Sequence, residues 1–248
     1  MMGEVLLKCA GLNKRFGGVM ALAEVEFSIN RGEIYGLIGP NGAGKTTLFS
    51  LIAGSIPPSA GEVLLDGVSM LGRPAFKMVR AGVVRTHQIV KPFPNLSVVE
   101  NVVVGALHAG GRAMGSARDR AVEVLAFVGL EDRTHAFPGT LTLAGRKRLE
   151  LARALATAPR VLMLDEVIAG LNPAEAQALA TLIRRVRDER QVSVIMIEHV
   201  MPAVMSLSDR VVVLDRGRKI AEGTPAEVVN DSVVVDAYLG ENHEGGTA

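Results

Sequence analysis

A run of glycines beside a lysine and two threonines is the first feature of this sequence that could do chemistry. The nine residues are Gly39, Pro40, Asn41, Gly42, Ala43, Gly44, Lys45, Thr46 and Thr47. Glycines let backbone amides turn inward around a phosphate, and the positive end of a following helix faces the same anion. Lys45 would reach the β and γ phosphates, and the Thr46 hydroxyl would bind Mg²⁺. The spacing predicts a site for a nucleoside triphosphate, and the alternative is a glycine-rich turn ahead of a helix.

Two acids end a short apolar segment later in the chain. Residues 161–164 are all apolar, and Asp165 and Glu166 follow them directly. If the segment is a buried parallel strand, its carboxyl end opens where ligands bind in α/β sheets. Asp165 is then the expected partner of Mg²⁺, and Glu166, pointing the other way, could polarise the attacking water. The alternative is a strand that simply ends in a polar turn, and the phosphate loop favours the catalytic interpretation.

A histidine and a glutamine could complete such a site. His199 follows the apolar run 192–197 by two positions, so it would approach the γ phosphate from another strand end. A lone histidine is more often a surface residue or a satisfied core residue. Gln88 precedes Pro92, and its amide could reach Mg²⁺ or the water. From the residues alone, Gln88 is equally an ordinary loop glutamine.

The segments around these residues predict an α/β fold with a mostly parallel sheet. Nearly unbroken apolar runs, which are typical of strands covered on both faces, occupy residues 34–38, 161–164 and 192–197. Shorter antiparallel strands are expected at residues 5–9, 25–29 and 63–65, and a late hairpin at residues 211–215 and 219–221. Two helix starts carry capping boxes, at Ser97 with Glu100 and at Asn172 with Glu175.

The chain is expected to form one domain with an insertion. Residues from about 92 to 158 show helical periodicity and few strand signals, so we predict a helical subdomain there. Residues 1–91 and 159–240 would form the catalytic α/β core, which includes the antiparallel β subdomain near the N-terminus. Residues 241–248 are mostly polar and include two glycines, which predicts a flexible tail.

Composition excludes several classes of protein. The 248 residues are 48% hydrophobic and 21% charged, so the chain can bury a core without disulfides, and the single Cys9 fits a reducing compartment. A net charge of +1 provides no basic stripe for a nucleic-acid partner. The mean hydropathy is +0.29, but no apolar run approaches the roughly 20 residues of a spanning helix, and no signal peptide is recognisable. We expect a soluble cytoplasmic protein whose apolar excess is buried inside it or covered by a partner.

In order and spacing these motifs resemble the ATPase subunits of ATP-binding cassette (ABC) transporters over nearly the whole chain. The specific part of the resemblance is the phosphate loop combined with Gln88, Asp165, Glu166, residues 170–173 and His199. It implies a P-loop NTPase (RecA-like) core that binds ATP and Mg²⁺ and hydrolyses ATP. It further implies that Phe16 stacks on adenine and that Gln88 senses both Mg²⁺ and the membrane subunit. By the same resemblance, Glu166 is the general base and His199 the switch histidine.

The resemblance also implies a dimer in which two subunits enclose two ATP molecules. Each nucleotide lies between one subunit's phosphate loop and the other's signature segment, which is usually Leu-Ser-Gly-Gly-Gln. The aligned residues here are Leu141, Thr142, Leu143, Ala144 and Gly145. Thr142 keeps a hydroxyl that could cap a helix and touch a phosphate across the dimer, whereas Leu143 and Ala144 replace glycines that allow close approach. Residues 142–145 are expected to contact ATP in trans. We therefore expect ATP binding to persist even where fast hydrolysis is lost. Val167 also departs from the usual proline.

Within the family, five segments look like those of ATPases of branched-chain amino-acid importers. They are residues 13–18, 85–88, 169–173, 197–201 and 237–240. This implies import of branched-chain or related amino acids, with integral-membrane permease subunits, a second ATPase subunit that is a copy or a paralogue, and indirectly a solute-binding protein. The chain would then lie on the inner face of the cell membrane, with the loop 88–94 near a docked permease helix. A low-turnover regulatory subunit and an ATPase for another solute are the alternatives.

Overall fold

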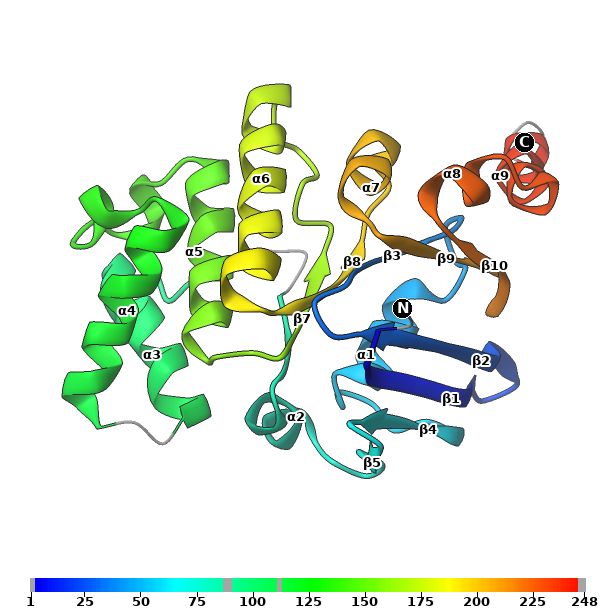
Figure 1. Ribbon diagram of the computed structural model, residues 1–248, viewed down its shortest axis with the longest axis horizontal. Helices are drawn as coiled ribbons and strands as arrows, with labels where there is room; N and C mark the ends of the chain where they lie inside the picture. The colour runs from blue at the N-terminus through cyan, green and yellow to red at the C-terminus, as the bar shows by residue number, and fades with distance from the viewer. Residues whose placement is uncertain (1–2, 87–90, 111–112, 245–248) are drawn as a thin grey trace. The chain divides into compact units, whose positions relative to one another are not determined.

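The computed structural model describes residues 3–86, 91–110 and 113–244, and contacts divide the chain into two compact units. One unit comprises Met1–Ala75 with Ser193–Ala248, and the other comprises Phe76–Val192. Figure 1 shows the helices and strands of both units. This division by contacts does not follow the sequence-predicted edges of the helical subdomain, which stay a prediction.

The first unit contains an antiparallel sheet. Its strands are β1 (Val5–Phe16), β2 (Val19–Asn30), β4 (Ala60–Leu65) and β5 (Val68–Ser69), in the order β2-β1-β4-β5. β1 is antiparallel to both β2 and β4, which confirms the expected antiparallel strands. β1 and β2 are longer than predicted because both continue, with register shifts, as far as the turn after Phe16. Alternate residues such as Leu7 and Cys9 of β1 are fully buried.

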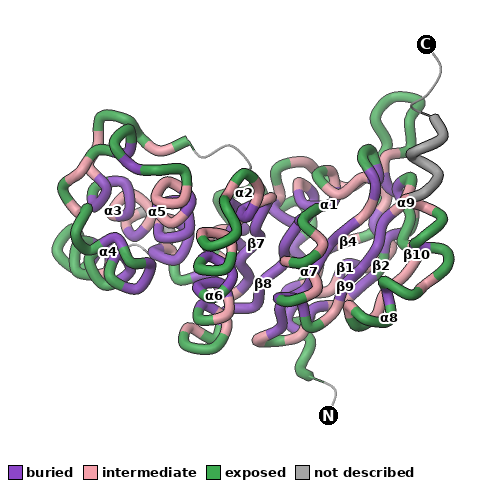
Figure 2. The backbone as a smooth tube through the Cα atoms, turned by 90° about the horizontal axis from the view of Figure 1, so that it is seen from above, coloured by how far each residue is buried: buried purple, intermediate pink, exposed green. Residues whose placement is uncertain are grey.

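The same unit contains strands of a second sheet. They are β3 (Ile34–Ile38), β8 (Ser193–Ile197), β9 (Arg210–Asp215) and β10 (Arg218–Gly223), in the order β10-β9-β3-β8. β3 precedes the phosphate loop, and β10 is antiparallel to β9. β3 is parallel to β8 and to β9, and every residue of β3 and β8 is buried. In Figure 2 the strand labelled β8 is coloured as buried. The late hairpin is confirmed, because Arg216 and Gly217 both have positive φ and turn the chain from β9 to β10.

In the part of the chain that the structure describes, four helices belong to the first unit. They are α1 (Lys45–Ile52), α7 (Met201–Leu207), α8 (Pro225–Val229) and α9 (Ser232–Glu244). α9 continues to Glu244, and the flexible tail expected at 241–248 stays a prediction. Residues 241–244 contain no glycine or proline that would end a helix, and residues 245–248 lie outside the described residues.

The second unit combines two parallel strands with a group of helices. β6 (Val83–Arg85) lies parallel to β7 (Val161–Asp165). The helices are α2 (Ala75–Ala81), α3 (Val98–Gly110), α4 (Met114–Val128), α5 (Leu143–Ala156) and α6 (Pro173–Arg190), with short 3₁₀ turns η1 (Glu131–Arg133) and η2 (Pro138–Thr140). Between residues 92 and 158, the described residues include helices and no strand. In the described part of the whole chain, no helix is both long and apolar enough to cross a membrane.

Local sequence explains how these helices begin and pack. Both predicted capping boxes are present: the Ser97 amide donates to Glu100 at 2.7 Å, and the box at Asn172 is closed by Glu175. α3, α4 and α5 lie side by side in Figure 1. At Gly105 a Cβ atom would lie only 2.5 Å from the carbonyl oxygen of Arg153, so the close approach of α3 and α5 requires glycine there.

Candidate functional site

The phosphate loop follows β3, and its shape depends on three glycines. Gly39, Gly42 and Gly44 have φ values of 146°, 74° and 99°. These are conformations that residues with a Cβ rarely adopt. A Cβ on Gly39 would lie 2.0 Å from the carbonyl oxygen of Leu214, and one on Gly44 would lie 2.8 Å from that of Ala21. A Cβ on Gly42 would meet no atom within 4 Å. The backbone conformation therefore requires glycine at all three positions. At Gly39 and Gly44 there is also no room for a Cβ atom.

The helix that leaves the loop begins as an anion-binding helix should. α1 starts at Lys45 after Gly44, and in the described chain no side chain caps this end and its first turn has no acidic residue. The Lys45 ammonium donates to the carbonyl oxygens of Gly39 at 2.6 Å and Pro40 at 2.7 Å, so it lies over the loop. Thr46 is exposed in the first turn, and Thr47 is half-buried. This cradle fits the phosphates of a nucleotide in shape and in charge.

The turn between β9 and β10 is hydrogen-bonded to the phosphate loop. The Gly217 amide donates to the carbonyl oxygen of Ala43 at 3.1 Å, and the Ala23 amide donates to that of Gly217 at 2.8 Å. A Cβ on Gly217 would lie 2.6 Å from the carbonyl oxygen of Ala21. Sequence reasoning identified this turn but missed that it holds the loop. The pattern of an arginine and a glycine between two strands reveals the turn alone.

Two further predicted residues lie in the same unit as the loop. Phe16 ends β1 with 49% of its surface exposed, and the Lys14 ammonium lies 5.0 Å from the centre of its ring. His199 is exposed just after β8, next to Glu198, which is 1% exposed. Both therefore have surface that a nucleotide could reach. That Phe16 stacks on adenine and that His199 contacts the γ phosphate stay predictions.

The first acid, Asp165, ends β7 and forms a buried ion pair that the sequence did not reveal. Arg85 Nη2 donates to Asp165 Oδ2 at 2.6 Å, and the two side chains are 13% and 6% exposed. The Asp165 amide contacts Thr86 Oγ1 at 3.4 Å. Removing one member of a buried ion pair costs about 3–5 kcal/mol, because the other charge is left without compensation. Arg85 thus fixes the carboxylate expected to bind Mg²⁺. The parallel pairing of β6 with β7 brings the two together.

The second acid, Glu166, has a left-handed backbone, with φ of 51°. Lys147 of α5 donates from Nζ to the carbonyl oxygen of Glu166 at 3.1 Å, and Lys147 is only 5% exposed. Val167, the residue found where proline is usual, is 6% exposed. No spacing in the sequence related Lys147 to Glu166, because the two residues meet only through the packing of α5 onto the end of β7.

The predicted signature segment forms the start of α5. Thr142 Oγ1 accepts a hydrogen bond from the Gly145 amide at 3.1 Å, which confirms Thr142 as a helix cap. Leu143 is 38% exposed at the first helical position, and Ala144 follows it. The side chains of Leu143 and Ala144 thus occupy the first turn of the helix, where glycines would leave the backbone open.

The predicted magnesium ligands come from separate parts of the chain. Gln88 lies outside the described residues. Thr46 belongs to the first unit and Asp165 to the second, so their meeting around a nucleotide stays a prediction. Within the described ranges, no group of three or more His, Cys, Asp or Glu side chains could hold a metal. The donors present fit Mg²⁺ instead, because this ion is usually held by one or two carboxylates together with substrate phosphates and water.

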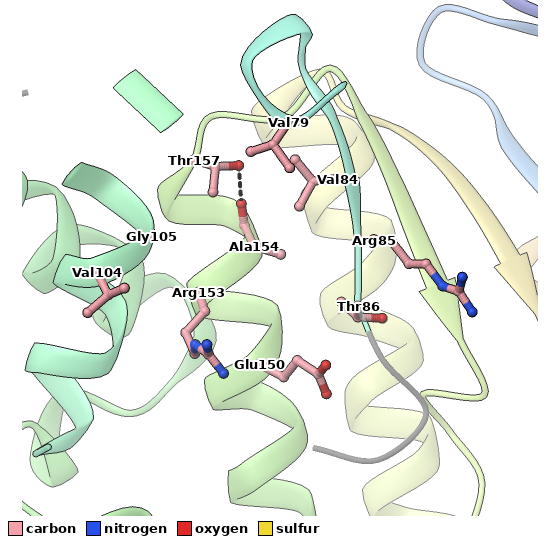
Figure 3. A pocket seen from close by; sticks show the side chains of 10 residues that line it. All are labelled: Val79, Val84, Arg85, Thr86, Val104, Gly105, Glu150, Arg153, Ala154 and Thr157. Carbon is pink, nitrogen blue, oxygen red and sulfur yellow. Dashed lines mark hydrogen bonds between the residues drawn. The ribbon is translucent and has the colours of Figure 1, made fainter. Parts of the chain in front are cut away.

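A groove lies within the second unit, between the end of β6 and the helices α3 and α5 (Figure 3). Its lining residues are Val79, Val84, Arg85, Thr86, Val104, Gly105, Glu150, Arg153, Ala154 and Thr157. Arg153 donates to the carbonyl oxygen of Lys91 at 3.1 Å, and its guanidinium lies 5.1 Å from the centre of the Phe93 ring. Burial lowers the pKa of Arg153, although the Glu150 carboxylate opposes this shift. The groove thus joins apolar walls to one acidic side chain, Glu150, and two basic ones, Arg85 and Arg153.

Comparisons with known proteins place this geometry in context. A family model described as "ABC transporter" matches residues 22–169, and one described as "Branched-chain amino acid ATP-binding cassette transporter" matches residues 218–244. The chain is 40% identical to the high-affinity branched-chain amino acid transport ATP-binding protein BraF of Pseudomonas aeruginosa, over 97% of this chain and 100% of BraF. It is 40% identical to the corresponding protein LivG of Escherichia coli K12, over 97% of this chain and 100% of LivG.

The solved structures include a similar fold. The ADP conformation of MJ1267, an ATP-binding cassette of an ABC transporter, matches with a TM-score of 0.86 and 28% identity, over 95% of this chain and 99% of that one. The match extends over almost the whole of both chains. It confirms the predicted α/β class with a P-loop NTPase core.

Proposed function

Because the chain belongs to the ATP-binding subunits of ABC transporters, a family that hydrolyses ATP, we propose that it powers the import of branched-chain or related amino acids. The observation that carries this proposal is the glycine cradle after β3 with Lys45 folded over it. The two 40% identical relatives, both branched-chain amino acid transport proteins, support the choice of solute.

In this proposal the phosphate loop holds the nucleotide. Backbone amides of residues 39–47 bind the phosphate oxygens, and Lys45 leaves its two carbonyl partners to contact the β and γ phosphates. Phe16 stacks its half-exposed ring on the adenine. The helix dipole of α1 adds a favourable interaction of about 0.3–2 kcal/mol with the same phosphates.

Three side chains are proposed to hold the magnesium ion. Thr46 would bind the ion through its hydroxyl, Asp165 through a water molecule, and Gln88 through its amide oxygen. When bound there, Mg²⁺ would neutralise the charge that develops on the phosphates. Asp165 stays oriented because Arg85 donates a hydrogen bond to one of its oxygens.

Glu166 is proposed as the general base and His199 as the residue that contacts the γ phosphate. Glu166 accepts a proton from the attacking water, while Lys45 and the loop amides stabilise the charge on the transferred phosphoryl group. A second ABC ATPase subunit contributes its own residues 142–145 across the nucleotide. ATP binding then closes the pair of subunits, and hydrolysis reopens it.

The groove of Figure 3 is the proposed contact with an integral-membrane permease. Its valines offer an apolar floor, and Glu150 and Arg153 offer charges that can fix the direction of a short helix. Through the permease the chain would lie on the inner face of the membrane and respond indirectly to a solute-binding protein. A Val104→Asp variant should lose co-purification with the permease and keep ATP affinity, whereas Val122→Asp, on an exposed position of α4, should keep both. Isolation from native membranes without any integral-membrane protein would contradict this role.

The central test is the Glu166→Gln variant. We expect Mg²⁺-dependent ATP hydrolysis to fall by a factor of about 10²–10⁴, the usual contribution of a positioned base, while ATP binding persists. Glu26→Gln, on the exposed face of β2, is the control that should change neither quantity. In proteoliposomes with its permeases, the wild-type chain should drive uptake of a branched-chain amino acid and Glu166→Gln should not. Wild-type turnover in Glu166→Gln would overturn the assignment of the base, and uptake of a different solute alone would overturn the cargo.

A second candidate function is a nucleotide-binding regulatory subunit with little turnover. The observation that favours it is the pair Leu143 and Ala144 in the first turn of α5. If these side chains limit turnover by keeping the partner's ATP away from the helix, Leu143→Gly with Ala144→Gly should raise hydrolysis strongly. Unchanged hydrolysis in this double variant would remove the reason for the regulatory role.

A further inference from the structure

Lys147 is a buried cation that the phosphate chemistry above does not use. It lies on α5 with 5% of its surface exposed, and its ammonium donates to the carbonyl oxygen of Glu166 at 3.1 Å. Taking a charged group out of water is costly, and an apolar side chain of similar size often serves packing better. A lysine at this position therefore points to a role for the hydrogen bonds that its ammonium makes.

The peptide that Lys147 contacts is an unusual one. Glu166 has φ of 51°, a left-handed conformation that is uncommon for a residue with a side chain. Val167 follows it and lacks the ring that would fix its own φ. Such a conformation persists only where the surrounding structure holds it, and it occurs most often at functional sites. The neighbouring Asp165 is held by Arg85, and Lys147 holds the carbonyl end of Glu166.

We propose that Lys147 is a positioning residue for hydrolysis: it fixes the peptide after Glu166 in its left-handed conformation and thereby aims the Glu166 carboxylate at the attacking water. This role rests on the proposed function of Glu166 as the base. Lys147 lies only five positions after the cap Thr142, so the same contact ties the start of α5 to the base. The start of α5 is the segment expected to meet the partner subunit's ATP.

The test compares two variants on adjacent positions of one helix. In Lys147→Met the hydrogen bond to Glu166 is lost, and in Arg148→Met a bond to the carbonyl oxygen of Val128, 3.2 Å long, is lost away from the acids. We expect Lys147→Met to lower kcat by about 10- to 100-fold, the usual effect of misplacing a reacting group by about 1 Å. Its KM for ATP, and its affinity for a fluorescent ATP analogue, should stay within about twofold of wild type because the phosphate loop is untouched. Lys147→Arg should recover most of kcat, and Arg148→Met should keep it.

The Glu166→Gln background separates this inference from the function on which it rests. If Lys147 acts through Glu166, adding Lys147→Met to Glu166→Gln should lower the residual rate no further. Full kcat in Lys147→Met, an equal loss in Arg148→Met, or an additive loss in the double variant would overturn the positioning role and leave the base in place. Wild-type turnover in Glu166→Gln alone would overturn the base. If Lys147→Met does not fold, Lys147→Ala, which removes the donor with a smaller side chain, gives the same comparison.

Discussion

Two helices of this protein begin in opposite ways. α8 is capped by Thr224, whose hydroxyl accepts from the Glu227 amide while the Glu227 carboxylate accepts from the Thr224 amide. α1 begins after Gly44, and in the described chain no side chain caps it. The first arrangement satisfies the helix's own amides and stabilises the fold. The second leaves the amides at that end of α1 available to an external anion. Because α4 and α7 also lack a side-chain cap among the described residues, it is the glycine loop before α1 that indicates function.

The start of α5 lies between these two cases. Thr142 Oγ1 accepts from the Gly145 amide, so the helix is capped as α8 is. A hydroxyl oxygen that accepts one hydrogen bond can still donate its own hydrogen to a phosphate oxygen. Thr142 can therefore stabilise α5 and touch a phosphate at the same time. Neither Gly44 nor Thr224 is placed to do both.

The largest expected effect comes from filling the loop beneath α1. Gly39→Ala would bring a Cβ to 2.0 Å from the carbonyl oxygen of Leu214, so loop and strand must separate. We expect a loss of about 2–5 kcal/mol in the free energy of unfolding, from overpacking and left-handed strain together. ATP binding should be lost with it. Gly42→Ala, which meets no atom within 4 Å, should cost only about 1–2 kcal/mol of strain. Denaturant unfolding and nucleotide titration measure both variants, and equal losses would contradict the steric argument.

The next effect concerns the charge at the start of α1. Lys45→Ala removes the ammonium that lies over Gly39 and Pro40. Because a hydrogen bond to a charged group contributes about 1.5–3 kcal/mol, ATP affinity should fall by about 10- to 100-fold with little change in stability. Titration with a fluorescent ATP analogue measures this, with Lys77→Ala on the exposed face of α2 as the control. If Lys77→Ala weakened binding as much, general surface charge and not the loop would attract the nucleotide.

Sequence reasoning succeeded wherever the pattern is local. The buried strand at residues 34–38, the hairpin turn at Arg216 and Gly217, and the caps at Asn172 and Thr142 each depend on neighbouring residues, and the structure has all of them. Strand β1 extends beyond the predicted residues 5–9 because its pairing with β2 and β4 decides its length.

The contacts that position the site were not predictable in this way. Arg85 meets Asp165, Lys147 meets Glu166, and Gly217 meets Ala43, and each pair is far apart in the sequence. Nothing in the type of these residues distinguishes them from other arginines, lysines and turn glycines. Only the pairing of strands and the packing of helices selects their partners.

A smaller effect separates the two roles of a threonine cap. Thr142→Ala and Thr224→Ala each remove one hydroxyl that accepts a backbone amide, at 3.1 Å and 3.4 Å. Each should lower the free energy of unfolding by about 0.5–2 kcal/mol. Only Thr142→Ala should also lower the rate of ATP hydrolysis, because only Thr142 is expected to contact a phosphate. An equal rate of ATP hydrolysis in the two variants would mean that Thr142 acts only as a helix cap.

The smallest effect is a dependence on pH at a capping box that contains a carboxylate, which α1 lacks. Hydrogen bonds from Ser97, first from its hydroxyl and then from its amide, lower the pKa of Glu100 below its ordinary value. A carboxyl whose pKa is lower in the folded state stabilises the fold above its unfolded pKa, and this contribution is lost as the pH falls through the folded pKa. Unfolding measured at neutral and at acid pH should therefore show a smaller acid-induced loss in Glu100→Gln than in wild type. The first turn of α1 contains no acid, so Glu100→Gln should leave ATP affinity at neutral pH unchanged. An unchanged acid-induced loss would mean that the box at Ser97 stabilises α3 through geometry alone, without the charge of Glu100.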